Sequence, residues 1–165
     1  GLAGAGASLV APGEAGAHSV AIGLLTPEGH VDLDACRRLR DAALGHEMVV
    51  AFLRTFDLLV DRTRGMNDIS ELGVTRVVTA GVLGWDAAVL SLDERMAVLA
   101  ADVRHATIAA GAAGRPVEVV PGGGVRASNA NEFLRVSPHL HASCRRGGTI
   151  SRDELTALDA VLRRR

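Results

Sequence analysis

The sequence predicts an α/β fold in which parallel strands alternate with helices. Apolar runs of strand-forming residues recur along the 165 residues, and stretches with helical periodicity separate them. Apolar residues make up 48% of the chain but aromatic residues only 2%, so Ala, Val, Leu and Ile must fill the core. That composition, together with 19 glycines, is typical of buried parallel strands. The alternation itself predicts β-α units that are joined by helical crossovers.

Five apolar runs are interpreted as strands, and turn residues or helical patterns separate them. We expect these strands at residues 19–23, 48–53, 76–79, 117–120 and 140–143.

The first two helices are expected after the first two strands. Asp32 or Asp34 can cap a helix that runs to about residue 44, because a short acidic side chain accepts from the free amides of the first turn. The second helix is expected over residues 58–72, and it ends at Gly73, the residue type that most often follows a helix.

Two further helices carry a capping-box spacing at their start. Ser91 and Glu94 open a long helix over about 91–110, and Ser151 and Glu154 open the last one. The apolar positions recur at helical spacing, so we expect the buried faces to consist of Met96, Leu99, Val103, Ala106 and Ala110 in the long helix and of Leu155, Leu158 and Leu162 in the last.

Two architectures can hold such units: a doubly wound open sheet and a closed (β/α)8 barrel. Length alone favours the open sheet, because a whole barrel needs about 250 residues. The pattern of strands and helices leaves both open.

Composition excludes several classes of function for this chain. The net charge is −1, so neither nucleic acid nor a membrane is an expected partner. There is no lysine, which excludes Schiff-base and pyridoxal-phosphate chemistry. The two cysteines, Cys36 and Cys144, cannot form a disulfide framework, and a reducing cytoplasm is the expected location. The start, residues 1–17, indicates neither a signal peptide nor a membrane anchor.

Five short segments, in order and at similar spacing, resemble the CutC family, the barrel proteins named for copper homeostasis. They are 23–32 (GLLTPEGHVD), 50–57 (VAFLRTFD), 77–81 (VVTAG), 121–125 (PGGGV) and 141–145 (HASCR). The chain departs from the family pattern at two positions, where Leu53 replaces a histidine and Ala80 replaces a serine.

The resemblance implies a TIM (β/α)8-barrel type of fold, truncated to about the last five β-α units. One partial-barrel domain is expected over 1–165, with a poorly defined Gly/Ala-rich start at 1–14. The resemblance also implies a cytoplasmic protein that takes part in copper homeostasis and can bind copper ion. Proteins of this shape can pair, so a homo-oligomer is a possible partner state.

The triple glycine Gly122, Gly123 and Gly124 is a candidate site for a phosphate or another small anion. A glycine run after a strand lets backbone amides point at an anion, and barrel phosphate sites follow the last two strands. Ser143 can add a hydroxyl, and Arg145 can clamp an oxyanion through two N–H groups. The alternative is a tight turn between a strand and a helix, without a ligand.

The candidate metal ligands are His141 and Cys144, because imidazole and thiolate together suit Cu(I). His139 lies on the same face if the strand continues that far. The alternative is a hydrogen-bonded histidine beside a small buried cysteine. Arg54 and Asp57 are the catalytic candidates: Arg54 can bind a carboxylate or phosphate and Asp57 can act as a base, or the two can pair to order their loop.

Three functions therefore stay open from the sequence. The first is the copper role that the resemblance implies. The second is a TIM-barrel enzyme or binding protein for a small phosphorylated or anionic ligand, for which Gly122–Gly124, Ser143, Arg145 and Arg54 are the motivation. The third is an inactive fragment. Whether the chain is an enzyme is left undecided.

Overall fold

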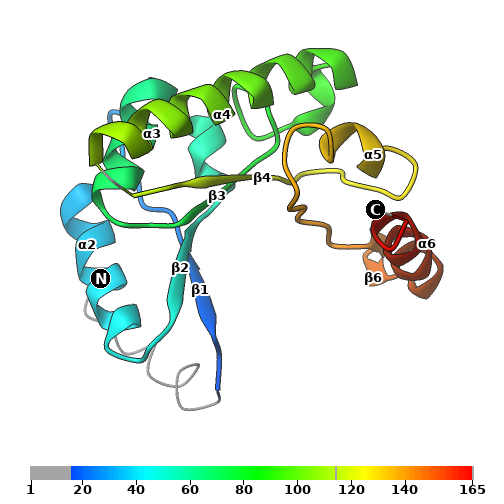
Figure 1. The fold of residues 1–165 in the computed structure, drawn as a ribbon, viewed down its shortest axis with the longest axis horizontal. Helices are drawn as coiled ribbons and strands as arrows, with labels where there is room; N and C mark the ends of the chain where they lie inside the picture. The colour runs from blue at the N-terminus through cyan, green and yellow to red at the C-terminus, as the bar shows by residue number, and fades with distance from the viewer. Residues whose placement is uncertain (1–15, 114, 165) are drawn as a thin grey trace.

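Four parallel strands form the centre of the computed structural model, which describes residues 16–113 and 115–164 (Figure 1). They are β1 (Ser19–Ile22), β2 (Val49–Phe52), β3 (Arg76–Thr79) and β4 (Glu118–Pro121), and they lie side by side in the order β1-β2-β3-β4. Each neighbouring pair is parallel. The parallel α/β prediction is therefore confirmed. The predicted start at 1–14 lies outside the described residues.

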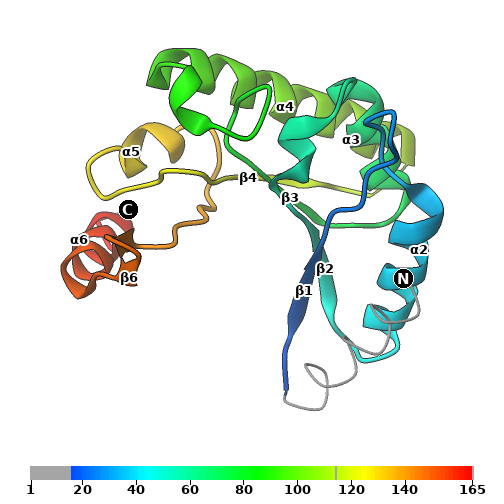
Figure 2. The ribbon, with the colours of Figure 1, turned by 180° about the vertical axis from the view of Figure 1, so that it is seen from behind.

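Three helices cover one face of this sheet: α2 (Leu33–Leu44), α3 (Arg62–Glu71) and α4 (Leu92–Ala113), and α3 and α4 run side by side in both views (Figures 1 and 2). The strand residues on that face, such as Phe52 and Val77, are fully buried. The alternate residues, such as Val49, Arg76 and Glu118, are exposed on the opposite face. The core thus lies between the sheet and its three helices.

The helix starts follow the capping residues. Asp32 caps α2, and its carboxylate accepts from the Ala35 amide at 2.9 Å. Ser91 and Glu94 form a reciprocal capping box at α4. The second helix starts later than predicted, because η1 (Arg54–Leu58) is a separate 3-10 turn and Asp61 caps α3.

The chain after β4 departs most from the prediction. A short α5 (Ala130–Phe133) is followed by an antiparallel hairpin of β5 (Arg145–Arg146) and β6 (Thr149–Ile150) and then by α6 (Arg152–Leu162). Both views place α6 and its hairpin beyond α5, away from β1 and β2 (Figures 1 and 2).

The predicted strand at 140–143 is wrong. This segment has no regular secondary structure, and its bond to β4 runs from the His141 amide to the Pro121 carbonyl at 2.8 Å. Pro138 cannot donate to a ladder, and Cys144 takes a left-handed backbone with φ of 49°, which interrupts a strand. The segment therefore lies beside β4 without extending the sheet.

Glu154 joins α6 to the turn before α5. Its carboxylate accepts from the Ala127 amide at 2.8 Å and from the Arg146 guanidinium. These two partners lower the pKa of Glu154 below its ordinary value of 4.5, the Ala127 amide having the larger effect. A lowered pKa in the folded state contributes stability above pH 4.5, and that contribution is lost as the pH falls through the folded value.

We expect Glu154→Gln to reduce the acid sensitivity of α6, because glutamine does not titrate. Amide hydrogen exchange in α6 is the measurement. Between neutral pH and pH below 4.5, protection corrected for the intrinsic exchange rate should fall more in the unsubstituted protein than in Glu154→Gln. An equal fall in both proteins would assign the acid sensitivity to other groups.

Candidate functional site

The candidate site lies where β2, β3 and β4 end. Because parallel strands end at the same edge of a sheet, the segments that follow them meet there. β2 leads into η1, which carries Arg54 and Asp57. β3 ends at Thr79, and β4 leads into Gly122–Gly124.

Asp57 is the buried centre of this edge, with 1% of its surface exposed. Its carboxylate accepts from the Thr79 hydroxyl at 2.5 Å, from the Ala80 amide at 3.0 Å and from Nε of Arg54 at 2.9 Å. Arg62 Nη1 lies 3.5 Å away as a further ion-pair partner. With these donors in place, Asp57 holds Arg54 and the end of β3 in position. This geometry favours the alternative in which Arg54 and Asp57 pair to order their loop over the one in which Asp57 is a catalytic base.

A second buried pair supports the first. Arg62 of α3 binds Asp102 of α4 through Nε at 3.0 Å and Nη2 at 2.5 Å. The same guanidinium donates to the Thr79 hydroxyl and to the Val82 carbonyl, each at 3.0 Å, and stacks 4.5 Å from the centre of the Phe56 ring. Burial raises the pKa of Asp102, and the hydrogen bonds and charge of Arg62 oppose this rise. The pair therefore links both helices to the carboxyl end of β3.

Arg95 reaches the site from the buried face of α4. Its Nε donates to the Ala80 carbonyl at 2.7 Å, and its Nη2 donates to the Gly123 carbonyl at 2.7 Å. Burial lowers the pKa of Arg95, the positive charge of Arg54 adds to this effect, and Asp57 opposes it. Two guanidinium groups thus share one small region.

The glycine loop lies between these two arginines. Gly123 and Gly124 have positive φ angles of 66° and 80°, which favour glycine. A methyl group on Gly123 would lie 3.2 Å from Nη1 of Arg54, and one on Gly124 would lie 3.9 Å from Nη1 of Arg95. Among the described residues, these two Nη1 groups and the amides of both glycines have no hydrogen-bond acceptor. The loop can therefore offer N–H donors and positive charge to an anion.

The structure brings together only part of the predicted anion site. His141 packs on Gly122, with its Cβ 3.6 Å from where a methyl group on that glycine would lie. Ser143 and Arg145 are exposed. Arg145 pairs with Ile150 in the β5–β6 hairpin, and its backbone carbonyl accepts from Arg126. Their roles as ligand-binding residues stay predictions.

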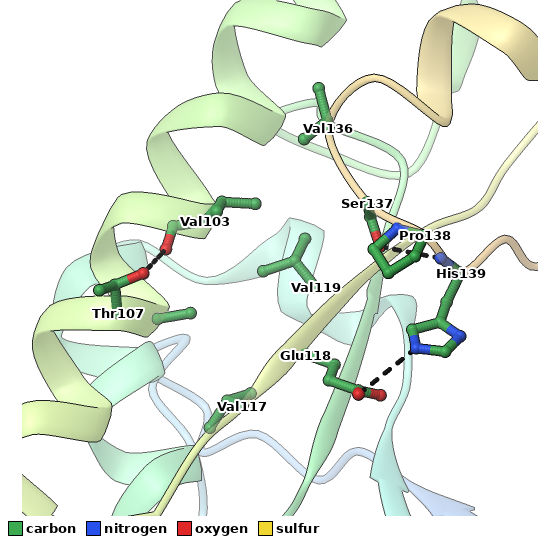
Figure 3. A pocket seen from close by; sticks show the side chains of 10 residues that line it. Val103, Thr107, Val117, Glu118, Val119, Val136, Ser137, Pro138 and His139 are labelled. Atoms are coloured by element: carbon green, nitrogen blue, oxygen red, sulfur yellow. Dashed lines mark hydrogen bonds and ion pairs between the residues drawn. The ribbon is translucent and has the colours of Figure 1, made fainter.

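His139 and His141 line one crevice of about 410 Å³ on the exposed face of the sheet, together with Arg76. Nε2 of His139 lies 3.4 Å from the Glu118 carboxylate, and this carboxylate also accepts from Arg76 at 2.7 Å. Figure 3 shows Glu118 and His139 facing one another beside a smaller crevice with apolar walls, between α4 and the end of the segment that follows α5. This imidazole therefore already has a carboxylate partner.

The cysteine and histidine side chains of the described residues do not fit a copper centre. Cys144 is buried against Ala130 and Leu158, and His141 is exposed at the glycine loop. Cys36 lies on the buried face of α2, where its thiol donates to the Leu24 carbonyl at 3.6 Å and burial raises its pKa. Within residues 16–113 and 115–164, no three His, Cys, Asp or Glu side chains gather to hold a metal. The pair His141 and Cys144 stays a prediction from the sequence.

Sequence reasoning missed three charged residues of the site: Arg62, Arg95 and Asp102. A signal for two of them exists. Arg95 and Asp102 are seven residues apart, two turns of α4, on the same face as Leu99 and Ala106. Charged residues at positions that a helix buries indicate partners inside the fold.

Comparisons with known proteins agree with the resemblance found in the motifs. A family model described as the CutC family matches residues 8–145. A CutC family protein of Histophilus somni is 36% identical over 132 residues, which cover 79% of this chain and 48% of the relative. One from Vibrio atlanticus is 31% identical over 131 residues, with coverage of 78% and 48%. The chain spans about half the length of these curated relatives.

Solved structures match in fold. A protein described as a candidate copper homeostasis protein CutC, from Streptococcus agalactiae, matches with a TM-score of 0.67 and 22% identity, over 84% of this chain and 61% of that chain. A 3-keto-L-gulonate-6-phosphate decarboxylase from Vibrio cholerae matches with a TM-score of 0.61 and 12% identity, over 98% of this chain and 68% of that chain. At these identities the likeness concerns the fold alone.

Proposed function

Because the chain belongs to the CutC family, we propose that it contributes a binding site for a small anionic ligand, with a phosphoryl or carboxyl group, to a protein of that family. The single observation that carries the proposal is the position of Arg54 and Arg95 on the two sides of the Gly123–Gly124 loop.

The charge of the site supports an anion. Three arginines, Arg54, Arg62 and Arg95, face the two carboxylates of Asp57 and Asp102. Within the described part of the chain, this edge therefore carries one positive charge more than it has carboxylates. An anion between Arg54 and Arg95 would relieve their mutual repulsion and accept from their Nη1 groups. Charge-assisted bonds of this kind are about twice as strong as neutral ones.

The proposed role is binding and not proton transfer. Arginine keeps its proton in proteins, and Asp57 is engaged by its donors. His141 is the histidine that packs on this loop, at Gly122. Any acid–base step would depend on His141 or on residues from the remainder of a full-length relative.

The barrel architecture is part of the proposal. Four parallel strands in sequential order, with helices on one face and open side chains such as Val49 and Ala51 on the other, suit one arc of a TIM-type barrel whose interior is the open face. A crystal structure of a full-length relative in which the residues matching Val49 and Ala51 faced solvent would contradict this arrangement.

A second candidate function is a part in copper homeostasis in the cytoplasm. Membership of the family favours it, and the two free buried thiols of Cys36 and Cys144 suit a reducing compartment. Within the part of the chain that the structure describes, no helix is long and apolar enough to cross a bilayer. The described residues offer no copper centre, so no step is assigned to copper here.

Thermal unfolding in the presence of inorganic phosphate or Cu(I) tests both functions. Phosphate at 100 times its dissociation constant should stabilise the folded state by about 2.7 kcal/mol. We expect this gain in the unsubstituted protein and in Arg104→Ala, an exposed arginine of α4, and we expect Arg54→Ala to lose it. A gain that survives in Arg54→Ala would contradict the proposed site. A gain with Cu(I) alone, abolished in Cys144→Ala, would support the copper function in its place.

A further inference from the structure

Trp85 stands beside the proposed anion site, on the loop that follows β3. Trp85 is 61% exposed. The guanidinium carbon of Arg54 lies 5.1 Å from the centre of the indole ring. Nη2 of the same arginine donates to the Trp85 carbonyl at 2.9 Å. Arg54 therefore connects the glycine loop and the tryptophan.

We infer that the ligand of this site carries an aromatic or other flat apolar group next to its anionic group, and that this group lies against Trp85. The inference rests on the proposed anion site and names the class of ligand that fits it. It depends on the way in which Arg54 divides its donors among Asp57, Trp85 and the glycine loop.

The division of these donors sets the position of the ligand. Nε of Arg54 is bound to Asp57 and Nη2 to the Trp85 carbonyl, which leaves Nη1, near Gly123, for the anion. The anionic group is thereby held on the same guanidinium that stacks on the indole. The guanidinium carbon lies 5.1 Å from the indole centre, so a ring attached to that group lies close to Trp85. Aromatic pairs interact at centroid separations of about 4.5–7 Å.

The exposure of the indole gives the contact a driving force. An indole that is largely exposed leaves apolar surface in water, and covering it with a ligand ring removes that surface. The indole is also held from one side by Arg54, so little freedom is lost when a ring packs on it. A ligand with only a phosphoryl group would use the arginines and leave this surface in water.

The chain contains one tryptophan and no tyrosine, so its indole fluorescence reports Trp85 alone. Phenyl phosphate and methyl phosphate are the two probes, because they share the anionic group and differ in the ring. We expect phenyl phosphate to bind about two- to tenfold more tightly, the range that an aromatic pair contributes. We also expect phenyl phosphate to change the indole emission more than methyl phosphate does.

Calorimetry on variants then assigns the preference to the ring. In Trp85→Ala the ratio of the two affinities should fall to about one, and in Trp85→Phe it should partly return. Val89→Ala, which shortens another exposed apolar side chain of the same loop, should keep the ratio.

The outcomes separate the two proposals. A ratio near one in the unsubstituted protein, or a ratio that survives in Trp85→Ala, overturns the inference and leaves the anion site standing. Failure of both phosphates to bind overturns the anion site, and the aromatic inference with it.

Discussion

Asp102→Ala should lower the free energy of unfolding by about 3–5 kcal/mol, the cost of removing one partner of a buried ion pair. The side chain of Asp102 is 2% exposed and that of its partner Arg62 is 10% exposed. Without the carboxylate, the guanidinium keeps the Thr79 hydroxyl and the Val82 carbonyl as acceptors. Its buried charge loses its closer counterion and keeps Asp57, which lies 3.5 Å away and is already paired with Arg54. Urea unfolding is the measurement.

Asp159→Ala is the matched control, because it removes an aspartate from a helical ion pair on the surface. Asp159 in α6 and its partner Arg163, the residue that caps the end of this helix, are 53% and 77% exposed. Exposed pairs contribute about 0–1 kcal/mol, so the control should change the free energy of unfolding little. A loss for Asp102→Ala no larger than that of the control would mean that the Arg62–Asp102 pair does not hold α3 and α4 to the sheet.

The strands and helices could be predicted where one local pattern decides them. β3 has the predicted bounds, and β1, β2 and β4 differ from prediction by no more than one residue at either end. The reason is that each run is apolar on the side that meets the helices and lies between turn or helix signals. The caps at Asp32 and Ser91 are equally local, since they depend on a side chain and an amide three residues away.

The segment at 140–143 shows where such patterns fail. Its residues form strands readily, yet strand formation depends on a neighbour that offers a continuous ladder. β4 offers this segment one bond, at His141, and the left-handed Cys144 turns the chain into the β5–β6 hairpin. The apolar pattern of the sequence shows neither the single bond to β4 nor the left-handed backbone of Cys144.

The backbone of the site could be predicted from the sequence, but most of its charged side chains could not. The triple glycine and Arg54 could be found because they directly follow strands, and parallel strands end at one edge. Arg95 and Arg62 come from helices, and they reach the same edge only through the packing of α3 and α4. A sequence shows the spacing of such residues along a helix but not the carbonyl or carboxylate that they meet.

Gly81→Ala should destabilise the fold by about 2–5 kcal/mol, because it combines backbone strain with overpacking. Gly81 is buried and has a φ of 69°, a conformation that costs an alanine energy. The added methyl group would lie 2.6 Å from the Arg95 carbonyl oxygen and 2.7 Å from Cγ of Leu99. Both atoms belong to α4, so the helix must move, and Arg95 must move with it. We therefore expect weaker phosphate binding as well as a lower unfolding midpoint.

Gly111→Ala also adds one methyl group, here within α4, and should raise the free energy of unfolding where Gly81→Ala lowers it. Gly111 lies inside the helix, and among the described residues no atom outside its immediate helical neighbours lies within 4 Å of the added carbon. Alanine in a helix is about 0.5–1 kcal/mol more favourable than glycine, so this variant should gain stability and keep its phosphate affinity. If the two variants shifted the urea midpoint in the same direction, the close approach of α4 to the end of β3 would be wrong, and with it the placement of Arg95 behind the glycine loop.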